Sequence, residues 1–482
     1  MEARAKRSGR RRHEGRHKIE GGLRVGRFAA AAALGLALAV PGRLHAKVDA
    51  KEHSAALREM SRSESVLDID AFLAALKTVL KGDDARSVRA AVASYSRIAA
   101  AARMKLEPRD LLSLHGKAAA AFAPVQSKAA LDEFRKLLTA HREWEGRLLL
   151  LDASGVSKGV PRLESCLTAL EDEHPIVIRR AVQYLARAKT VPAAEAVVKR
   201  YLDVVKKKGT ASNASEWTRT QLAFQSALGS MFHVDLPAPE DYKNYFEARK
   251  DDPHLFNPEK RFSEDSRSSV TLFGAAVTGK YIIFVLDVSG SMLTTDPLPE
   301  GQKERERPRT VVVDPTRPPP KENPREDRQR MFRAKKELAS VVRSLPDDVR
   351  FNIITYASEV HAWKKTMVPA SGANKKSAAE HIAGFKADGI TVTDMALEEA
   401  FSDLDVDTIY LVTDGAPTHI GTITGGRLPE DAHDLIRAIH ERVEELNFLR
   451  GVRVFTLGFK DAEVNFLKKL AADNQGRHVE IR

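Results

Sequence analysis

Cysteine is almost absent from this chain of 482 residues, in which Cys166 is the only one. A single cysteine excludes an intrachain disulfide, and it also excludes zinc sites built from several thiolates. Cys166 lies in the amphipathic stretch RLESCLTALED, so we expect it to be a small, buried side chain.

The apolar run near the start of the chain is short. It covers 13 uncharged residues from Phe28 to Val40, whereas a membrane-spanning helix needs about 20. A basic segment precedes it, Pro41 interrupts it, and Ala46 precedes a polar stretch, which is the pattern of a secretory signal. We therefore predict export to the periplasm, the cell surface or the medium, with membrane attachment only if residues 1–46 are not cleaved. The alternative is a disordered basic tail followed by an Ala-rich helix.

Positive charge is concentrated at the same end. Of the formal net charge of +11, residues 1–27 carry +7 and Arg43 adds one more. The remaining residues, 47–482, are nearly balanced, so the basic composition does not indicate a nucleic-acid surface. We expect no nucleic-acid partner.

Residues 67–232 are rich in Ala and Leu with helical spacing, and few segments resemble strands. Two stretches 90 residues apart, beginning at Val88 and Ile178, share an i, i+3, i+4, i+7 apolar pattern. In both stretches an arginine follows the first apolar residue, Arg89 in one and Arg179 in the other.

This offset is close to two periods of a repeat of about 40–47 residues. The region resembles HEAT repeats, and Pro192 is placed as a first-turn proline of the next helix. A plain helical bundle would have the same spacing and stays open as the alternative. If the helices pair and stack, they form an extended face suited to binding proteins.

Residues 235–270 mix prolines, charges and aromatic residues without a steady period, and we interpret them as a linker without chemistry. Its contacts with neighbouring domains are expected from Tyr242, Tyr245, Phe246 and Phe256.

From residue 271 to residue 482, strand-like runs alternate with amphipathic helices. Residues 282–286, 408–414 and 452–459 are apolar runs typical of strands buried on both faces. The alternation predicts an α/β domain in which helices cover both sides of a doubly wound, mostly parallel, Rossmann-like sheet. The all-α domain precedes it in the chain.

Two of these apolar runs end in turns that carry oxygen side chains. FVLDVSGSM supplies Asp287, Ser289 and Ser291, YLVTDGAP supplies Asp414, and GITVTDMALEEA places a threonine near 391 just before a helix. Because the carboxyl ends of parallel strands form the ligand-binding rim of such sheets, we expect these side chains to lie together. Two carboxylates and three hydroxyls, without imidazole or thiolate, suit a magnesium-like ion that keeps some of its water.

The three segments resemble the motifs of von Willebrand factor type A (VWA) domains that have a metal-ion-dependent adhesion site (MIDAS). DVSGSM matches the Asp-x-Ser-x-Ser signature, GITVTDMAL resembles the threonine segment, and TDG resembles the second aspartate turn. They occur in the family's order, and the resemblance covers about residues 271–482. It implies an open coordination position for an Asp or Glu carboxylate of a partner protein. The ligands that it implies for Mg²⁺ or Mn²⁺ are Asp287, Ser289, Ser291, Thr391 and Asp414.

The sequence departs from the family pattern in two places. Ile390 replaces the second glycine of the threonine loop, which leaves Thr393 as an alternative to Thr391. Residues 293–326, where the family has a short connector, are rich in proline and in both charges, which predicts a disordered insertion. Beside the ion, the insertion would shield the open position, present a binding segment, or be a tolerated surface loop. His419 near the rim either contacts a partner or is a solvated loop histidine.

We therefore expect an exported protein-binding module and not an enzyme, with the helical domain as a second interaction surface. A phosphatase of the haloacid-dehalogenase type needs a second aspartate where this chain has Ser289, and VSGSM is not a Gly-x-Ser-x-Gly nucleophile turn. The alternatives are an accessory subunit of a chelatase-like machine and a metal-free scaffold. Because the chain has no Gly-x-x-x-x-Gly-Lys-Ser/Thr loop, such a machine would need a partner ATPase.

Overall fold

The structure is a computed structural model, and it describes residues 68–207, 214–257, 270–297, 328–418 and 432–481. The expected export segment 1–46 and His419 lie outside these residues. Of the expected insertion, only residues 293–297 are described.

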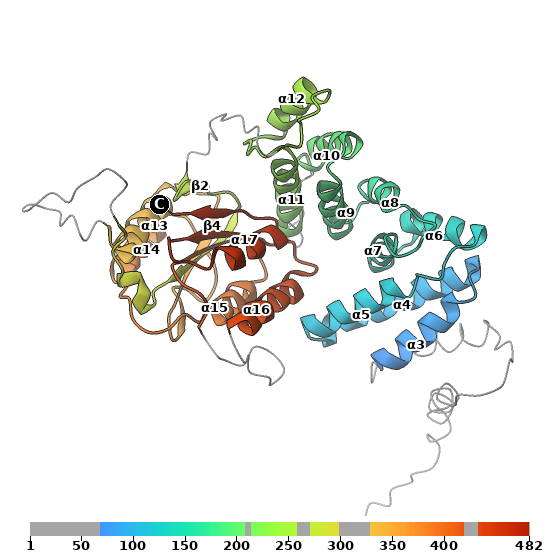
Figure 1. Ribbon diagram of the computed structural model, residues 1–482, viewed down its shortest axis with the longest axis horizontal. Coiled ribbons are helices and arrows are strands. Elements are labelled where there is room, and N and C mark those ends of the chain that lie inside the picture. Colours follow the sequence, from blue (N-terminus) through green and yellow to red (C-terminus); the bar gives the residue numbers. More distant parts are fainter. Residues whose placement is uncertain (1–67, 208–213, 258–269, 298–327, 419–431, 482) are drawn as a thin grey trace, which may run out of the picture.

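Every element described between residues 69 and 249 is a helix, and Figure 1 shows these helices as an arc beside the sheet domain. The α9 helix begins with Pro175, and Pro192 lies in the first turn of α10, where the missing amide donor costs nothing. Cys166 is buried in α8, as expected. The helices are α3 (Ile69–Leu80), α4 (Ala85–Lys105), α5 (Pro108–Ala120), α6 (Lys128–Ala140), α7 (Trp144–Ala153), α8 (Arg162–Ala169), α9 (Pro175–Ala188), α10 (Val191–Val204), α11 (Ala214–Phe232) and α12 (Pro239–Arg249).

The α12 helix lies inside the segment that we interpreted as a linker. Its first turn is fixed by Pro239 and by the Asp241 carboxylate, which accepts from the amide of Ala238 at 3.2 Å. Tyr242 and Phe246, one turn apart, are buried against the helical core. Only these two positions carry the helical period, which is too few to distinguish a helix from irregular chain.

The C-terminal domain is a seven-stranded sheet with strand order β5-β4-β3-β7-β8-β9, and β6 pairs with β4. The β3, β4, β7, β8 and β9 strands are parallel, whereas β5 and β6 run antiparallel to β4. A separate two-stranded ribbon joins β1 (Thr271–Leu272) and β2 (Ala275–Ala276). The strands of the main sheet are β3 (Tyr281–Asp287), β4 (Arg350–Tyr356), β5 (Val360–Ala362), β6 (Val368–Pro369), β7 (Thr408–Thr413), β8 (Arg453–Gly458) and β9 (His478–Glu480).

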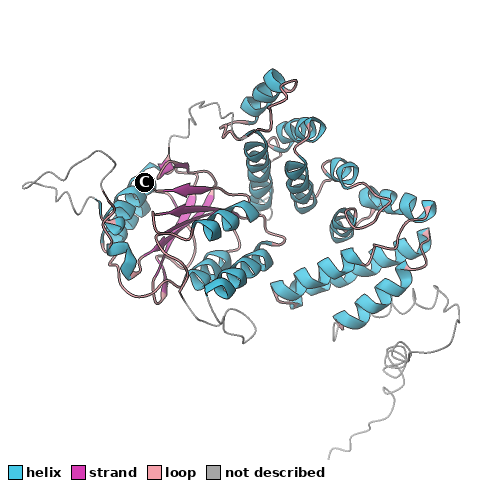
Figure 2. Ribbon diagram, in the orientation of Figure 1, coloured by secondary structure: helices cyan, strands magenta, loops and turns pink. Residues whose placement is uncertain are grey.

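Helices cover both faces of this sheet, as Figure 2 shows, and β3 is buried on both. Phe284 and Leu286 face the core beneath α13 and α14, whereas Ile283 and Val285 face the core beneath α15, α16 and α17. The sheet is therefore doubly wound and mostly parallel, as predicted. The helices are α13 (Arg330–Ser344), α14 (Gly372–Ala383), α15 (Thr393–Ser402), α16 (Ala432–Asn447) and α17 (Val464–Asp473).

Two buried arginines of the helical domain bond to the sheet domain. Arg219 of α11 donates to the carbonyls of Leu404 and Val406, both at 3.2 Å, and Arg179 of α9 donates to the carbonyl of Leu449 at 2.9 Å. Glu216 forms ion pairs with both arginines. We call the contacts of Arg179 and Arg219 with residues 404–406 and 449 the seam. Since buried polar groups require partners, the seam stabilises the packing of the two domains. Among the described residues, no helix combines the length and the apolar character needed to cross a membrane.

Candidate metal centre

The predicted site lies where β3 and β7 end side by side. These strands are parallel neighbours with Leu286 opposite Val412, so the next residues, Asp287 and Thr413, are adjacent. The Thr413 hydroxyl donates to Oδ2 of Asp287 at 2.7 Å, and the Ser289 amide donates to Oδ1 at 2.8 Å. Both carboxylate oxygens of the fully buried Asp287 are therefore held by donors.

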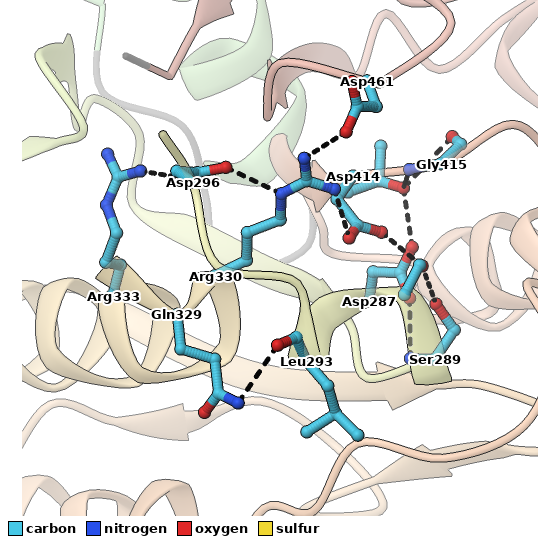
Figure 3. A network of polar contacts seen from close by, with 12 residues as sticks. Asp287, Ser289, Leu293, Asp296, Gln329, Arg330, Arg333, Asp414, Gly415 and Asp461 are labelled. Atoms are coloured by element: carbon cyan, nitrogen blue, oxygen red, sulfur yellow. Dashed lines mark hydrogen bonds and ion pairs between the residues drawn. The ribbon is translucent and has the colours of Figure 1, made fainter. Parts of the chain in front are cut away.

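The turn after β3 brings its serines to the second aspartate. The 3₁₀ helix η1 (Gly290–Leu293) follows Ser289 and carries Ser291. The hydroxyl oxygens of Ser289 and Ser291 are 3.0 Å apart, and Ser291 donates to Oδ1 of Asp414 at 2.6 Å. Figure 3 shows this chain of polar contacts from Asp287 through the serine turn to Asp414.

The threonine loop approaches the same place. A Cβ built on Gly415 would lie 3.8 Å from Oγ of Ser291 and 3.8 Å from Oγ1 of Thr391. Thr391 is held there because its amide donates to the Thr418 hydroxyl at 3.0 Å and its carbonyl accepts from the Thr418 amide at 3.1 Å. Ser291, Thr391 and Asp414 thus meet beside Gly415. Ser289 adjoins them through Ser291, and Asp287 is connected to them through Ser289 and Thr413.

The substitution in the threonine loop is accommodated without left-handed backbone at residue 390. Gly389 has the positive φ, 82°, that favours glycine, whereas Ile390 does not, and its side chain is 48% exposed. Thr393 is the first residue of α15 and is almost fully buried. The hydroxyl that faces Ser291 across Gly415 is that of Thr391.

Burial disfavours the charged form of Asp287. The loss of solvent raises the pKa of Asp287 to about 6, although hydrogen bonds from Ser289 and Thr413 act in the opposite direction. Its strand neighbour Tyr356 is fully buried beside it. A buried acid with a raised pKa would be stabilised in its charged form by a nearby cation.

The sequence alone did not reveal the basic side of the site. Arg330, in the first turn of α13, donates to Oδ2 of Asp414 and to Oδ1 of Asp296, both at 2.9 Å, and also pairs with Asp461 (Figure 3). Arg333 pairs with Asp296. A basic residue at a helix N-terminus opposes the helix dipole, and this is the one signal that marked Arg330 as unusual.

The donor set fits a hard divalent cation. The four carboxylates of Asp287, Asp296, Asp414 and Asp461 and the two guanidinium groups leave a formal charge of −2 when all are ionised. Within the described residues, no group of three or more His, Cys, Asp or Glu side chains is arranged to hold a metal. Any ion at this rim would therefore rely on hydroxyl ligands. Such oxygen ligands suit an ion like Mg²⁺, whereas imidazoles and thiolates suit softer metals.

Comparison with known proteins identifies the domain. Residues 323–481 match the von Willebrand factor type A domain family, a span that includes Thr391 and Asp414 but begins after DVSGSM. The rat (Rattus norvegicus) voltage-dependent calcium channel subunit alpha-2/delta-3 is 33% identical over 169 residues, which cover 32% of this chain and 14% of that protein. The bovine (Bos taurus) inter-alpha-trypsin inhibitor heavy chain H4 is 25% identical over 228 residues, 45% of this chain and 19% of that protein. The chain thus corresponds to less than a fifth of these relatives.

Solved structures of the same kind are more distant in sequence. A von Willebrand factor type A protein from Catenulispora acidiphila is 20% identical, with a TM-score of 0.30, over 43% of this chain and 40% of that one. Proximal thread matrix protein 1 from the mussel byssus, described with a zinc-occupied MIDAS motif, is 17% identical, with a TM-score of 0.24, over 42% and 41% of the two chains. The family match and the sequence relatives, together with the α/β sheet, show that the C-terminal part of this chain is a von Willebrand factor type A domain.

Proposed function

We propose that this chain binds a partner protein through a divalent cation held at the rim of its VWA domain. The proposed ligands are Asp287, Ser289, Ser291, Thr391 and Asp414, and the ion is Mg²⁺ or Mn²⁺. When bound, the cation supplies a positive charge that accepts an Asp or Glu carboxylate of the partner. The observation that carries the proposal is the approach of the Ser291 and Thr391 hydroxyls to one point over Gly415, next to Asp414.

The hydrogen bonds of the site indicate which residues would bind the cation directly and which through water. The Ser291 hydroxyl donates to Asp414 and therefore accepts from Ser289, so one of its two lone pairs stays available to a cation. The two oxygens of Asp287 already accept from Thr413 and Ser289, which favours contact with the ion through water. A site with few directly bound charges leaves the cation able to attract a further carboxylate.

The names of the relatives are consistent with a binding role. One is a channel subunit and the other an inhibitor heavy chain, and neither name describes an enzyme. We propose that this chain is likewise not an enzyme, that it is exported by its N-terminal segment, and that its helical domain, HEAT-like or bundle-like, offers a second interaction surface.

The experiment is an array of peptides of equal length with a central Asp, Glu, Asn or Gln, probed with the full chain in Mg²⁺ and then in EDTA. The proposal expects capture by the acidic peptides in Mg²⁺ alone, and no capture by Asp287→Ala. Capture that survives EDTA would instead support the metal-free scaffold, whose binding surface would then be sought on the helical domain.

A further inference from the structure

The first residues of the segment that we predicted as an insertion, 293–326, are held against the residues that follow it, beside the proposed ion site. Thr295 and Gln329 form an antiparallel bridge, and the Asp296 amide donates to the carbonyl of Arg328 at 3.0 Å. The Arg330 amide in turn donates to the carbonyl of Thr294 at 3.0 Å. We call residues 293–297 with 328–330 the neck. Arg330 therefore belongs to the neck through its backbone and to the ion site through its side chain.

The side chain of Arg330 is almost fully buried between carboxylates of unequal exposure. Asp414 is fully buried, Asp296 is 12% exposed, and Asp461 is 66% exposed. Burial opposes the charge of the guanidinium, yet its hydrogen bonds to the three carboxylates raise its pKa, so it stays charged. The site thus has a permanent positive charge of its own.

Asp414 uses its two oxygens for different partners. Oδ1 accepts from the Ser291 hydroxyl and faces the proposed ligands, whereas Oδ2 accepts from Arg330 on the other side. The guanidinium does not contact Oδ1, the oxygen that faces the proposed ligands. It nevertheless neutralises part of the carboxylate charge that would attract the ion. In a buried setting, two cations that share one carboxylate repel each other appreciably.

From this geometry we propose that Arg330 is a resident counter-charge that stabilises the empty site and weakens metal binding, with Asp296 of the neck moderating its charge. The inference rests on the proposed function and deepens it, because it concerns regulation of the same site. Removing the positive charge should therefore have two opposite effects. It should lower the stability of the metal-free protein and raise its affinity for the ion. If Arg330 had only a structural role, its removal would lower both the stability of the metal-free protein and its affinity for the ion.

The test is calorimetric titration of Mg²⁺ and Mn²⁺ into the full chain, combined with thermal unfolding in EDTA. Arg330→Gln should lower the metal dissociation constant on the order of tenfold while lowering the Tm measured in EDTA. Lys460→Gln removes a nearby exposed positive charge and should change the dissociation constant by less than about twofold, since solvent screens it.

Asp296→Asn tests the same idea in the opposite direction and does not depend on Arg330→Gln folding. Losing the carboxylate leaves Arg330 less compensated, so the metal dissociation constant should rise roughly threefold or more. Asp461→Asn removes an equal charge from an exposed partner of Arg330 and should have a smaller effect than Asp296→Asn.

The possible outcomes distinguish a failure of this inference from a failure of the proposed metal-dependent binding. A wild-type chain that binds neither ion overturns the proposed function and the inference together. A wild-type chain that binds, with weaker or unchanged binding in Arg330→Gln or with unchanged binding in Asp296→Asn, overturns the inference alone.

Discussion

Ser291 and Asp414 are 123 residues apart in the chain, and the serine hydroxyl donates to the aspartate at 2.6 Å. The contact exists because β3 and β7 are parallel neighbours whose carboxyl ends lie at the same rim of the sheet. It joins two of the three motifs of the candidate site. Because Ser291 donates its proton to Asp414 and accepts from Ser289, one of its lone pairs is left for a cation.

The first prediction distinguishes the two threonines of the loop. Thr391→Val removes a hydroxyl that faces the site and should raise the Mg²⁺ dissociation constant at least tenfold, in keeping with the loss of one metal ligand. Thr393→Val is the matched control, since this threonine is buried at the start of α15. Calorimetric titration of both variants measures the difference, and an equal loss of affinity in the two would contradict the assignment of Thr391.

The second prediction concerns pH and Asp287. Because its pKa in the folded protein, about 6, is above the ordinary value of about 3.9, the group favours folding most below pH 4. That contribution is lost as the pH rises through 6, and it amounts to roughly 3 kcal/mol between pH 4 and pH 7 in the metal-free protein. Affinity for the cation should change in the opposite sense and fall below pH 6, because the ion requires the ionised carboxylate.

The measurement is the free energy of unfolding in EDTA from pH 4 to pH 7, for wild type and Asp287→Asn. Asparagine cannot ionise, so the variant should gain stability relative to wild type as the pH rises. Parallel pH profiles for the two proteins would show that Asp287 does not titrate in this window.

The third prediction concerns the seam between the domains. Arg219→Ala leaves the carbonyls of Leu404 and Val406 without this donor and removes one partner of Glu216. Hydrogen bonds to charged groups and buried unpaired acceptors suggest a loss of about 3 kcal/mol in the free energy of unfolding. Arg97→Ala, on an exposed position of α4, should change it by less than about 0.5 kcal/mol. Denaturant unfolding of the full chain compares the two, and similar small losses would mean that the seam contributes little.

Most of the sheet domain could be predicted from the sequence because its buried strands are continuous apolar runs. The run 282–286 has no polar interruption and became the central β3, buried on both faces. The motif residues could be placed for the same reason, since each follows the carboxyl end of a strand or precedes a helix. The sequence could not show how the backbone accommodates Ile390, because the positive φ falls on Gly389; Thr391 as a ligand stays a prediction.

The contacts that the sequence did not reveal depend on side chains meeting across long separations. Arg89 and Arg179 occupy equivalent places in the two repeated stretches, yet Arg89 is an exposed partner of Glu133 whereas Arg179 is buried at the seam. No local pattern separates them, because the difference comes from the sheet domain that lies against α9. Arg330 was overlooked in the same way, since its partner Asp414 is 84 residues away.

Whether the rim holds a divalent cation is decided by the Tm of the full chain in excess Mg²⁺ and in EDTA, for wild type and Asp287→Ala. A cation that binds only the folded protein stabilises it by about 2.7 kcal/mol at a hundredfold excess over its dissociation constant. We expect a clear rise in the Tm of the wild type in Mg²⁺ that is absent from the variant. A Tm that does not change with Mg²⁺ or Mn²⁺ in the wild type, or that rises equally in Asp287→Ala, would contradict this expectation.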